Sequence, residues 1–405
     1  MKRIILCAIA YMFLNTTQVN AQWQQTAGPN SVTINCMAAS GTNLFAGTDN
    51  GIFLSADSGT TWLPVDSGLT STVVYSLAIS GANMFAGTYN GGVFLSTNNG
   101  ANWIAVDSGL TNTSVDTVFK SITINSLVVI GTNIFAGTAG YGVFLSTNNG
   151  ISWTAVNAGL RDTTVNALAV VGNTLVAGTN AYAVSVSTNN GANWTLADSG
   201  LAATNVYSFA VSGTNIFAST NQGVFLTADT GVRWTAASIG FQSYNAVYSL
   251  AATGTNVFAG TQGGGVFLST DNGTSWTDAN NGLTTTYISS LLVSGTTIYA
   301  GTNGSAVWKR SLSDVLAVQN ITNDYISVSI YPNPAGNQLT VYSLQFIHPA
   351  TVIIYNMLGE TMLSYTLSFG EGRGEALNIS ALSAGIYFLQ MKWEGGSANK
   401  RFVKE

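Results

Sequence analysis

Apolar and polar residues alternate in short runs along most of this chain, and turns rich in Gly and Asn separate the runs. Residues 74–105 contain four such runs, and the fourth opens with Trp103. Alternation at period two between Gly/Asn turns is typical of β-hairpins rather than helices. Each unit of this kind therefore predicts four short antiparallel strands.

The unit is repeated at near-constant spacing, marked by Phe-Ala-Gly-Thr or a close variant. The copies begin at Phe45, Phe85, Phe135, Val176, Phe217, Phe258 and Tyr299. The intervals are 40, 50, 41, 41, 41 and 41 residues. Four strands repeated every forty or so residues indicate the blades of a β-propeller. We therefore predict an all-β chain with a seven-bladed β-propeller over residues 22–311.

The two ends of the repeated region complement each other. The seventh unit, residues 287–310, contains three strands and lacks the fourth. Residues 23–26 begin with Trp23 and resemble a fourth strand with nothing before it. Pairing the two would hide two strand edges that could otherwise template aggregation. We expect the N-terminal strand to close the ring in this way.

The first 21 residues resemble a secretory signal peptide. Lys2 and Arg3 precede an apolar run, Ile4 to Leu14, and a small-residue site ends at Ala21. Such a run is too short for a membrane span, which needs about 20 residues. The chain is therefore expected to enter the periplasm without a transmembrane segment. Only Cys36 would remain in the mature protein, so no internal disulfide is expected.

Six turns share the pattern Ser/Thr-x-Asp/Asn-x-Gly-x-x-Trp. The Asp or Asn can accept backbone N–H groups and lock the turn, while Gly supplies a positive φ. These structural positions are Asp57, Asn98, Asn148, Asn189, Asp229 and Asp271. The turns resemble the Asp-box, or bacterial neuraminidase repeat, and the region resembles the sortilin and photosystem-assembly-factor group of propellers. Half of the turns carry Asn, a poor ligand for hard cations, so we expect no metal and no cofactor.

The neuraminidase repeat raises the question of a sialidase. That family uses three arginines, a Tyr–Glu pair and an acid/base Asp, but residues 22–311 contain no Glu and only Arg161, Arg233 and Arg310. The single His348 lies outside the propeller, which excludes a Ser-His-Asp triad there. We therefore expect no enzyme. The alternative is a glycoside hydrolase or lyase that uses two carboxylates among Asp49, Asp116, Asp162 and Asp278.

The turns between the second and third strands differ from copy to copy, and the loop into the third unit is longer than its siblings. Both should lie on the face opposite the Asp-box turns. Aromatic rings and amides suit neutral polar surfaces, so this rim is a candidate site for a glycan or protein. An ordinary solvated rim remains the other interpretation. The candidates are Tyr89, Asn90, Phe119, Tyr141, Asn180, Tyr182, Gln222, Gln262 and Asn303.

The composition of the chain argues against nucleic acid as a partner. Only 7% of residues are charged, compared with about 25% in typical soluble proteins, so neutral polar side chains must solubilise the surface. The net charge is −5 and no basic stripe is present. Nucleic-acid binding therefore lacks its electrostatic footprint.

The repeat ends near Ser311, and the composition changes further on. Residues 312–324 are interpreted as a linker. In residues 325–405 glutamates appear, and strands of period-two alternation predict a small immunoglobulin-like β-sandwich.

Four motifs in this last region occur in a specific order: Tyr-Pro-Asn-Pro at 331–334, residues 354–359, residues 382–387, and the basic tail at 400–404. Together they resemble the type A C-terminal sorting domain of the type IX secretion system of Bacteroidetes. The resemblance implies recognition by that secretion machinery and a secreted or outer-membrane-surface location reached through the periplasm. The basic side chains Lys400, Arg401 and Lys404 are expected to form an exposed address.

Overall fold

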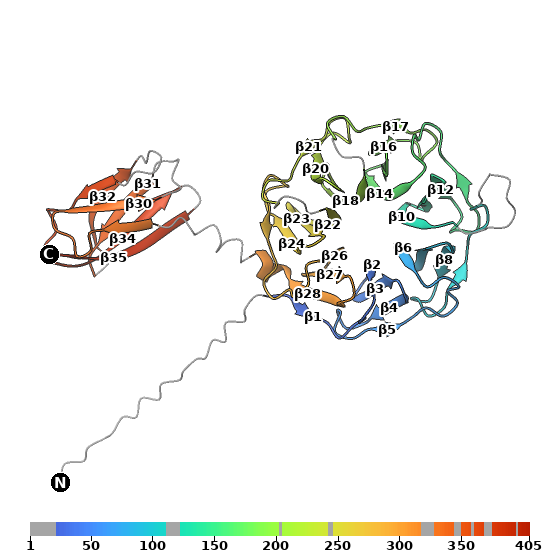
Figure 1. Cartoon of the computed structure of the whole chain (residues 1–405), viewed down its shortest axis with the longest axis horizontal. Coiled ribbons are helices and arrows are strands. Elements are labelled where there is room, and N and C mark those ends of the chain that lie inside the picture. The colour runs from blue at the N-terminus through green and yellow to red at the C-terminus, as the bar shows by residue number, and fades with distance from the viewer. Residues whose placement is uncertain are drawn as a thin grey trace, which may run out of the picture. The chain divides into compact units, whose positions relative to one another are not determined.

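The computed structural model describes residues 22–110, 122–201, 205–241, 246–316, 328–343, 350–357, 360–367, 375–393 and 396–405. The chain divides into two compact units, Met1–Leu312 and Ser313–Glu405. The first is a ring of small sheets and the second is a β-sandwich (Figure 1). The expected signal peptide and the long loop into the third repeat lie outside the described residues.

In the described part of the first unit, seven antiparallel four-stranded sheets form the ring. The first strands are β2 (Ile34–Ser40), β6 (Val74–Ser80), β10 (Ile124–Ile130), β14 (Val165–Val171), β18 (Val206–Ser212), β22 (Val247–Thr253) and β26 (Ile288–Ser294). The second strands are β3 (Asn43–Thr48), β7 (Asn83–Thr88), β11 (Asn133–Thr138), β15 (Thr174–Thr179), β19 (Asn215–Thr220), β23 (Asn256–Thr261) and β27 (Thr297–Thr302).

The outer half of each sheet is shorter. The third strands are β4 (Gly51–Ser55), β8 (Gly92–Ser96), β12 (Val143–Ser146), β16 (Val184–Ser187), β20 (Gly223–Thr227), β24 (Val266–Ser269) and β28 (Val307–Ser311). The fourth strands are β5 (Leu63–Pro64), β9 (Ile104–Ala105), β13 (Thr154–Ala155), β17 (Thr195–Leu196), β21 (Thr235–Ala236), β25 (Thr277–Asp278) and β1 (Gln24–Gln25). All-β propeller architecture, as the sequence predicts, is confirmed.

The last sheet takes strands from both ends of the repeated region, in the order β1-β28-β27-β26. Gln24 pairs with Lys309, and Gln25 pairs with Trp308. Trp23 is 2% exposed, and its Nε1 donates to the Ala279 carbonyl oxygen at 2.6 Å. The N-terminal strand therefore supplies the outer edge of the seventh sheet.

Large side chains pack between neighbouring sheets. In one cluster Phe45 and Ile52 of the first sheet lie against Val74, Phe94 and Trp103 of the second. The Trp103 Nε1 also donates to a carbonyl of the preceding sheet at 2.7 Å. Burying one such ring stabilises the fold by roughly 25 cal/mol per Å² over 150–250 Å², a few kcal/mol.

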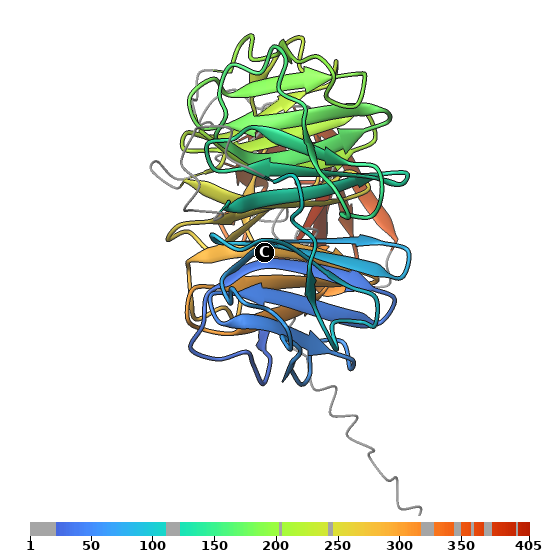
Figure 2. The ribbon, with the colours of Figure 1, turned by 90° about the vertical axis from the view of Figure 1, so that its right-hand side faces the viewer.

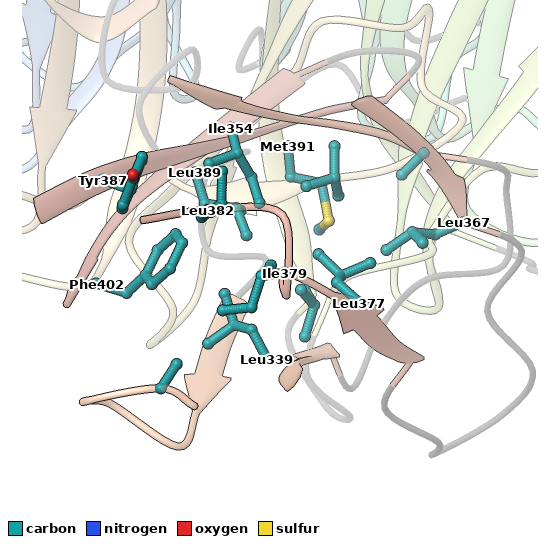
Figure 3. Close-up of a cluster of buried hydrophobic side chains, with 14 residues drawn as sticks. Leu339, Ile354, Leu367, Leu377, Ile379, Leu382, Tyr387, Leu389, Met391 and Phe402 are labelled. Carbon is teal, nitrogen blue, oxygen red and sulfur yellow. The ribbon is translucent and has the colours of Figure 1, made fainter. Parts of the chain in front are cut away.

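The second unit contains two antiparallel sheets. One has three strands in the order β29 (Val328–Tyr331), β30 (Gln338–Ser343) and β33 (Glu375–Asn378). The other has four, in the order β32 (Thr361–Leu367), β31 (Ala350–Tyr355), β34 (Gly385–Trp393) and β35 (Gly396–Lys404). Side chains from both sheets, such as Leu339, Ile354 and Phe402, gather in one core (Figure 3).

The first residues of the expected linker are helical. Residues 312–316 form a helical turn, in which Val315 is 1% exposed. The Leu312 N–H donates to the Thr296 carbonyl oxygen at 2.8 Å. Burial of Val315 and this bond extend ordered structure past Ser311, while residues 317–324 lie outside the described residues.

The final strand carries the predicted basic address. Lys400 and Arg401 are exposed, but Lys404 is only 6% exposed, so the expectation that it is exposed is wrong. Alternation along β35 places Lys404 on the same face as the buried Phe402. The strand's open edge is covered by Asn333, whose Oδ1 accepts the Val403 N–H at 2.9 Å.

Candidate functional site

A one-residue irregularity recurs in every first strand of the ring. In β6, Val74 pairs with Thr88 and Ser76 pairs with Gly87, so Tyr75 has no ladder partner. A bulge of this kind frees the extra residue and redirects its side chain. The residues at this position are Asn35, Tyr75, Asn125, Asn166, Tyr207, Tyr248 and Ser289.

These seven residues, with Thr33 and Tyr287, line a cavity of about 400 Å³. The first strands lie nearest the centre of the ring and contact one another around it (Figure 1). The cavity therefore receives one side chain from each of the seven sheets.

The register of the strands fixes the end of the ring at which the cavity lies. Because Val74 pairs with Thr88, each first strand begins at the end that holds the turn between the second and third strands. The Asp-box turns follow the third strands and lie at the other end. Figure 2 shows the sheets from the side, with turns at two opposite faces.

One side of the cavity is aromatic. The ring centroids of Tyr207 and Tyr248 are 5.1 Å apart, and those of Tyr248 and Tyr287 are 5.6 Å apart with an interplanar angle of 16°. We call these three residues the tyrosine wall. Burial raises the pKa of Tyr248 above its ordinary value, with smaller contributions from the neighbouring tyrosines. The phenol therefore stays uncharged at neutral pH.

The rest of the lining consists of Tyr75, amides and small hydroxyls. Asn35 and Asn125 donate through Nδ2 to the carbonyl oxygens of Val74 and Val165, each at 3.1 Å. The Ser289 Oγ donates to the Ile34 carbonyl oxygen at 2.7 Å. Each side chain thus bonds to the first strand of a neighbouring sheet and is held in a fixed orientation.

The rim residues predicted from sequence lie at the same end as the cavity. Tyr89 contacts Tyr75 edge to face, with ring centroids 6.1 Å apart. Gln262 accepts a hydrogen bond from the Tyr248 hydroxyl at 3.1 Å through Oε1. Asn303 accepts one from the Thr33 hydroxyl at 3.0 Å. These three therefore border the lining residues.

The other rim candidates within the described residues are exposed, except for Tyr141. Asn90 accepts a hydrogen bond from the Thr123 hydroxyl at 2.9 Å, which fixes its turn to the loop before β10. Tyr182 is 47% exposed, Asn180 and Gln222 are also exposed, and Tyr141 is half-buried. Phe119 lies outside the described residues.

None of the nine lining residues was predicted from the sequence, although several of their neighbours on the rim were. A signal for them exists in the aligned units. The bulge position holds Asn, Tyr, Asn, Asn, Tyr, Tyr and Ser in turn, whereas the residue before it is always Val or Ile. A position that varies beside an invariant apolar one would have indicated the site.

Three of the carboxylates considered for catalysis, Asp49, Asp162 and Asp278, lie within the described residues. Asp49 accepts the Thr33 N–H at 3.1 Å, and Asp162 accepts backbone N–H groups of Thr164 and Ala181 at 2.9 and 2.6 Å. Asp278 is exposed on the outer strand β25. Asp116 lies outside the described residues. None of the three described residues is among the residues that line the cavity.

The six Asp-box-like turns are closed by their own side chains. The Ser55 hydroxyl donates to Asp57 Oδ1 at 2.7 Å, and the Thr61 N–H donates to the same oxygen at 2.8 Å. Asn98 Oδ1 accepts the equivalent backbone N–H at 3.0 Å. The Thr61 backbone bond, helped by hydroxyl donors, holds the pKa of Asp57 well below its usual range. Within the described residues, no cluster of three His, Cys, Asp or Glu could hold a metal ion.

Comparison with known proteins identifies the second unit. Residues 329–405 match the family described as the secretion system C-terminal sorting domain. The chain is a β-propeller with a type IX secretion sorting domain. The sorting domain implies a secreted or cell-surface protein that reaches its destination through the periplasm. No curated protein matches the chain in sequence.

Solved structures resemble the chain in fold. PorZ of Porphyromonas gingivalis, a surface component of the type IX secretion system, is 15% identical with a TM-score of 0.56 over 91% of this chain and 59% of PorZ. The extracellular domain of the two-component system BT3049 of B. thetaiotaomicron is 14% identical with a TM-score of 0.60, over 95% of this chain and 57% of that one.

The third comparison is an enzyme. The GH74 xyloglucanase of Xanthomonas campestris is 15% identical with a TM-score of 0.56, over 72% of this chain and 54% of that one. The chain spans less than two thirds of the length of all three proteins. At these identities the likeness shows the fold alone. In the part of the chain that the structure describes, no helix is long and apolar enough to cross a membrane.

Proposed function

We propose that the protein is a secreted or cell-surface, non-catalytic β-propeller that binds a glycan or protein partner at the cavity end of its ring. The observation that carries the proposal is the cavity itself, which takes one side chain from each sheet and has no charged residue among the described residues that line it. Such a site suits recognition of a neutral polar group. Carboxylate catalysis of glycoside cleavage needs two acidic groups, and the lining that the structure describes has none.

Export through the type IX machinery follows from the sorting domain, and the contact that mediates it is part of the proposal. Lys400 and Arg401 are exposed on β35, the edge strand of the four-stranded sheet. These two charges would form the address, supported by Asn333, whose Nδ2 donates to the Arg401 carbonyl oxygen at 3.3 Å.

A carboxylate-dependent glycoside hydrolase or lyase is the second candidate, supported by the fold shared with a xyloglucanase. It would use two of Asp49, Asp116, Asp162 and Asp278. The position of Asp49 and Asp162 weighs against it, because neither is among the residues that line the cavity.

The two candidates are separated by testing the full-length chain on a glycan and peptide array and, in parallel, in a glycosidase and lyase screen. We expect binding without turnover, and weaker binding after Tyr89→Ala, because Tyr89 contacts the lining residue Tyr75. Turnover that disappears in Asp49→Ala or Asp162→Ala would instead establish the enzyme.

A further inference from the structure

The size of the cavity limits what part of a ligand can enter it. Its volume, about 400 Å³, lies near the lower end of the roughly 300–1,000 Å³ range of small-ligand sites. Its walls come from all the sheets of the ring, so they surround the axis. A site of this size admits one part of a larger ligand.

The chemistry of the lining selects among ligand classes. All nine residues are Tyr, Asn, Ser or Thr, with neither a charged nor an aliphatic side chain. An acidic sugar or a phosphate would need Arg or Lys to pair with its charge. An apolar ligand would need aliphatic surface to bury against. Phenol rings, hydroxyls and amides instead match a group that has both C–H faces and many hydroxyls.

The lining is also divided in space. In a ring of seven sheets, the sixth lies across from the second and third, so Tyr248 of β22 faces Tyr75 of β6 and Asn125 of β10. The tyrosine wall thus stands opposite a side that carries amides and one further tyrosine, Tyr75. A pyranose ring has the same division, with a flat C–H face and hydroxyls around its edge.

Three amides have unused hydrogen-bonding capacity. Asn35 and Asn125 donate through Nδ2 to the Val74 and Val165 carbonyl oxygens, and neither Oδ1 acceptor has a partner among the described residues. The Asn166 side chain makes no hydrogen bond within the described part of the chain. Half-buried amides at a cavity surface whose donors or acceptors lack partners among the described residues can bind hydroxyl groups of a ligand.

From these observations we infer that the cavity binds one residue of a neutral saccharide chain, with the sugar stacked on the tyrosine wall and its hydroxyls bonded to Asn35, Asn125 and Asn166. This rests on the proposed function and narrows it to one ligand class. The bulge position of each first strand is then the position that sets specificity.

The test measures binding of the full-length protein to neutral tetrasaccharides of β-1,4-glucan, β-1,4-mannan and α-1,6-mannan by calorimetry, beside sialyllactose and a neutral hexapeptide pool. Tyr207→Ala and Asn166→Ala are the chosen variants, because neither side chain has a hydrogen bond to lose within the described structure. We expect Kd to rise about tenfold for Tyr207→Ala and about three- to tenfold for Asn166→Ala.

Asn193→Ala is the matched control, since Asn193 is exposed in an Asp-box-like turn at the other end of the ring. It should leave Kd unchanged, and melting curves would confirm that all three variants are folded. If only the peptide pool binds and Tyr207→Ala weakens it, the saccharide inference fails and the proposed function stands. If neutral saccharides bind all variants equally, or no probe binds, the inference is overturned; no binding by any array ligand would count against the proposed function as well.

Discussion

At the scale of single residues, the bulge position has two roles. Asn35, Asn125 and Ser289 line the cavity and bond to the backbone of a neighbouring sheet. Asn166, at the same position, lines the cavity without such a bond among the described residues. Equivalent residues in one ring therefore differ in their contribution to stability, which can be measured.

This difference predicts that Asn-to-Ala substitutions at two bulge positions lower stability by different amounts. Asn125→Ala removes the bond to the Val165 carbonyl oxygen and should lower the free energy of unfolding by about 1 kcal/mol. Asn166→Ala should lower it by less than about 0.5 kcal/mol. Urea titration of both variants measures the difference. Equal losses would show that the bond to Val165 does not stabilise the ring.

The turn residue Asp57 predicts a dependence on pH. Its pKa is lower in the folded chain than in the unfolded chain, so the ionised carboxylate stabilises the fold. This contribution is complete above the unfolded pKa, near 3.8, and is lost as the pH falls toward the folded pKa. Asp57→Asn should remove that dependence, since Asn98 closes an equivalent turn. Melting temperatures at pH 7, 4 and 3 should therefore converge for the two proteins as the pH falls. A constant gap would contradict the assignment.

At the scale of elements, the seventh sheet shows how the ring is held together. Its outer strand β1 is only two residues long, yet Trp23 beside it is buried and bonded to the sixth sheet. Most of the contribution of this segment should therefore come from packing of one indole ring rather than from the ladder.

Trp23→Ala should accordingly destabilise the propeller by about 3–5 kcal/mol. Leu63→Ala is the control, because Leu63 is exposed on β5, the equivalent outer strand of the first sheet. It should change stability by less than about 0.5 kcal/mol. Guanidinium unfolding followed by tryptophan fluorescence measures both, and similar effects of the two would refute the role of Trp23.

The sequence predicts these elements well because alternation and turn chemistry are local. A single unit such as Val74-Tyr75-Ser76 does not reveal the bulge, because only the pairing with the second strand shows it. The varying position is apparent only when the seven units are compared. Alternation with Phe402 along β35 could have predicted the burial of Lys404. The bond from Leu312 to Thr296 joins two segments that are not adjacent in sequence, which no local pattern encodes.

At the scale of the whole molecule, the chain combines a ring with a low surface charge and a sorting domain that carries its own core. The sorting domain implies export, and the ring is the part that would act after export. The ring and the sorting domain are separate compact units, so substitutions in one should leave the other intact.

The proposed role of the basic residues in export can be tested by substitution. The double variant Lys400→Ala, Arg401→Ala should retain the protein in the periplasm, because the proposed address would lose both exposed charges. Lys392→Ala, at an exposed lysine of β34, is the control and should be exported normally. Immunoblots of periplasm, cell surface and medium measure the distribution. Normal export of the double variant would place the address elsewhere in residues 329–405.

The most direct test of the account is to fill the cavity without removing any contact. Asn166→Trp places a large ring in the site, and Asn193→Trp places the same ring at the other end of the propeller. Calorimetry with the ligand found on the array should show binding abolished in the first variant and unchanged in the second, with both melting near the wild-type temperature. Full affinity of a folded Asn166→Trp protein would contradict the claim that the ring of bulge residues is the binding site.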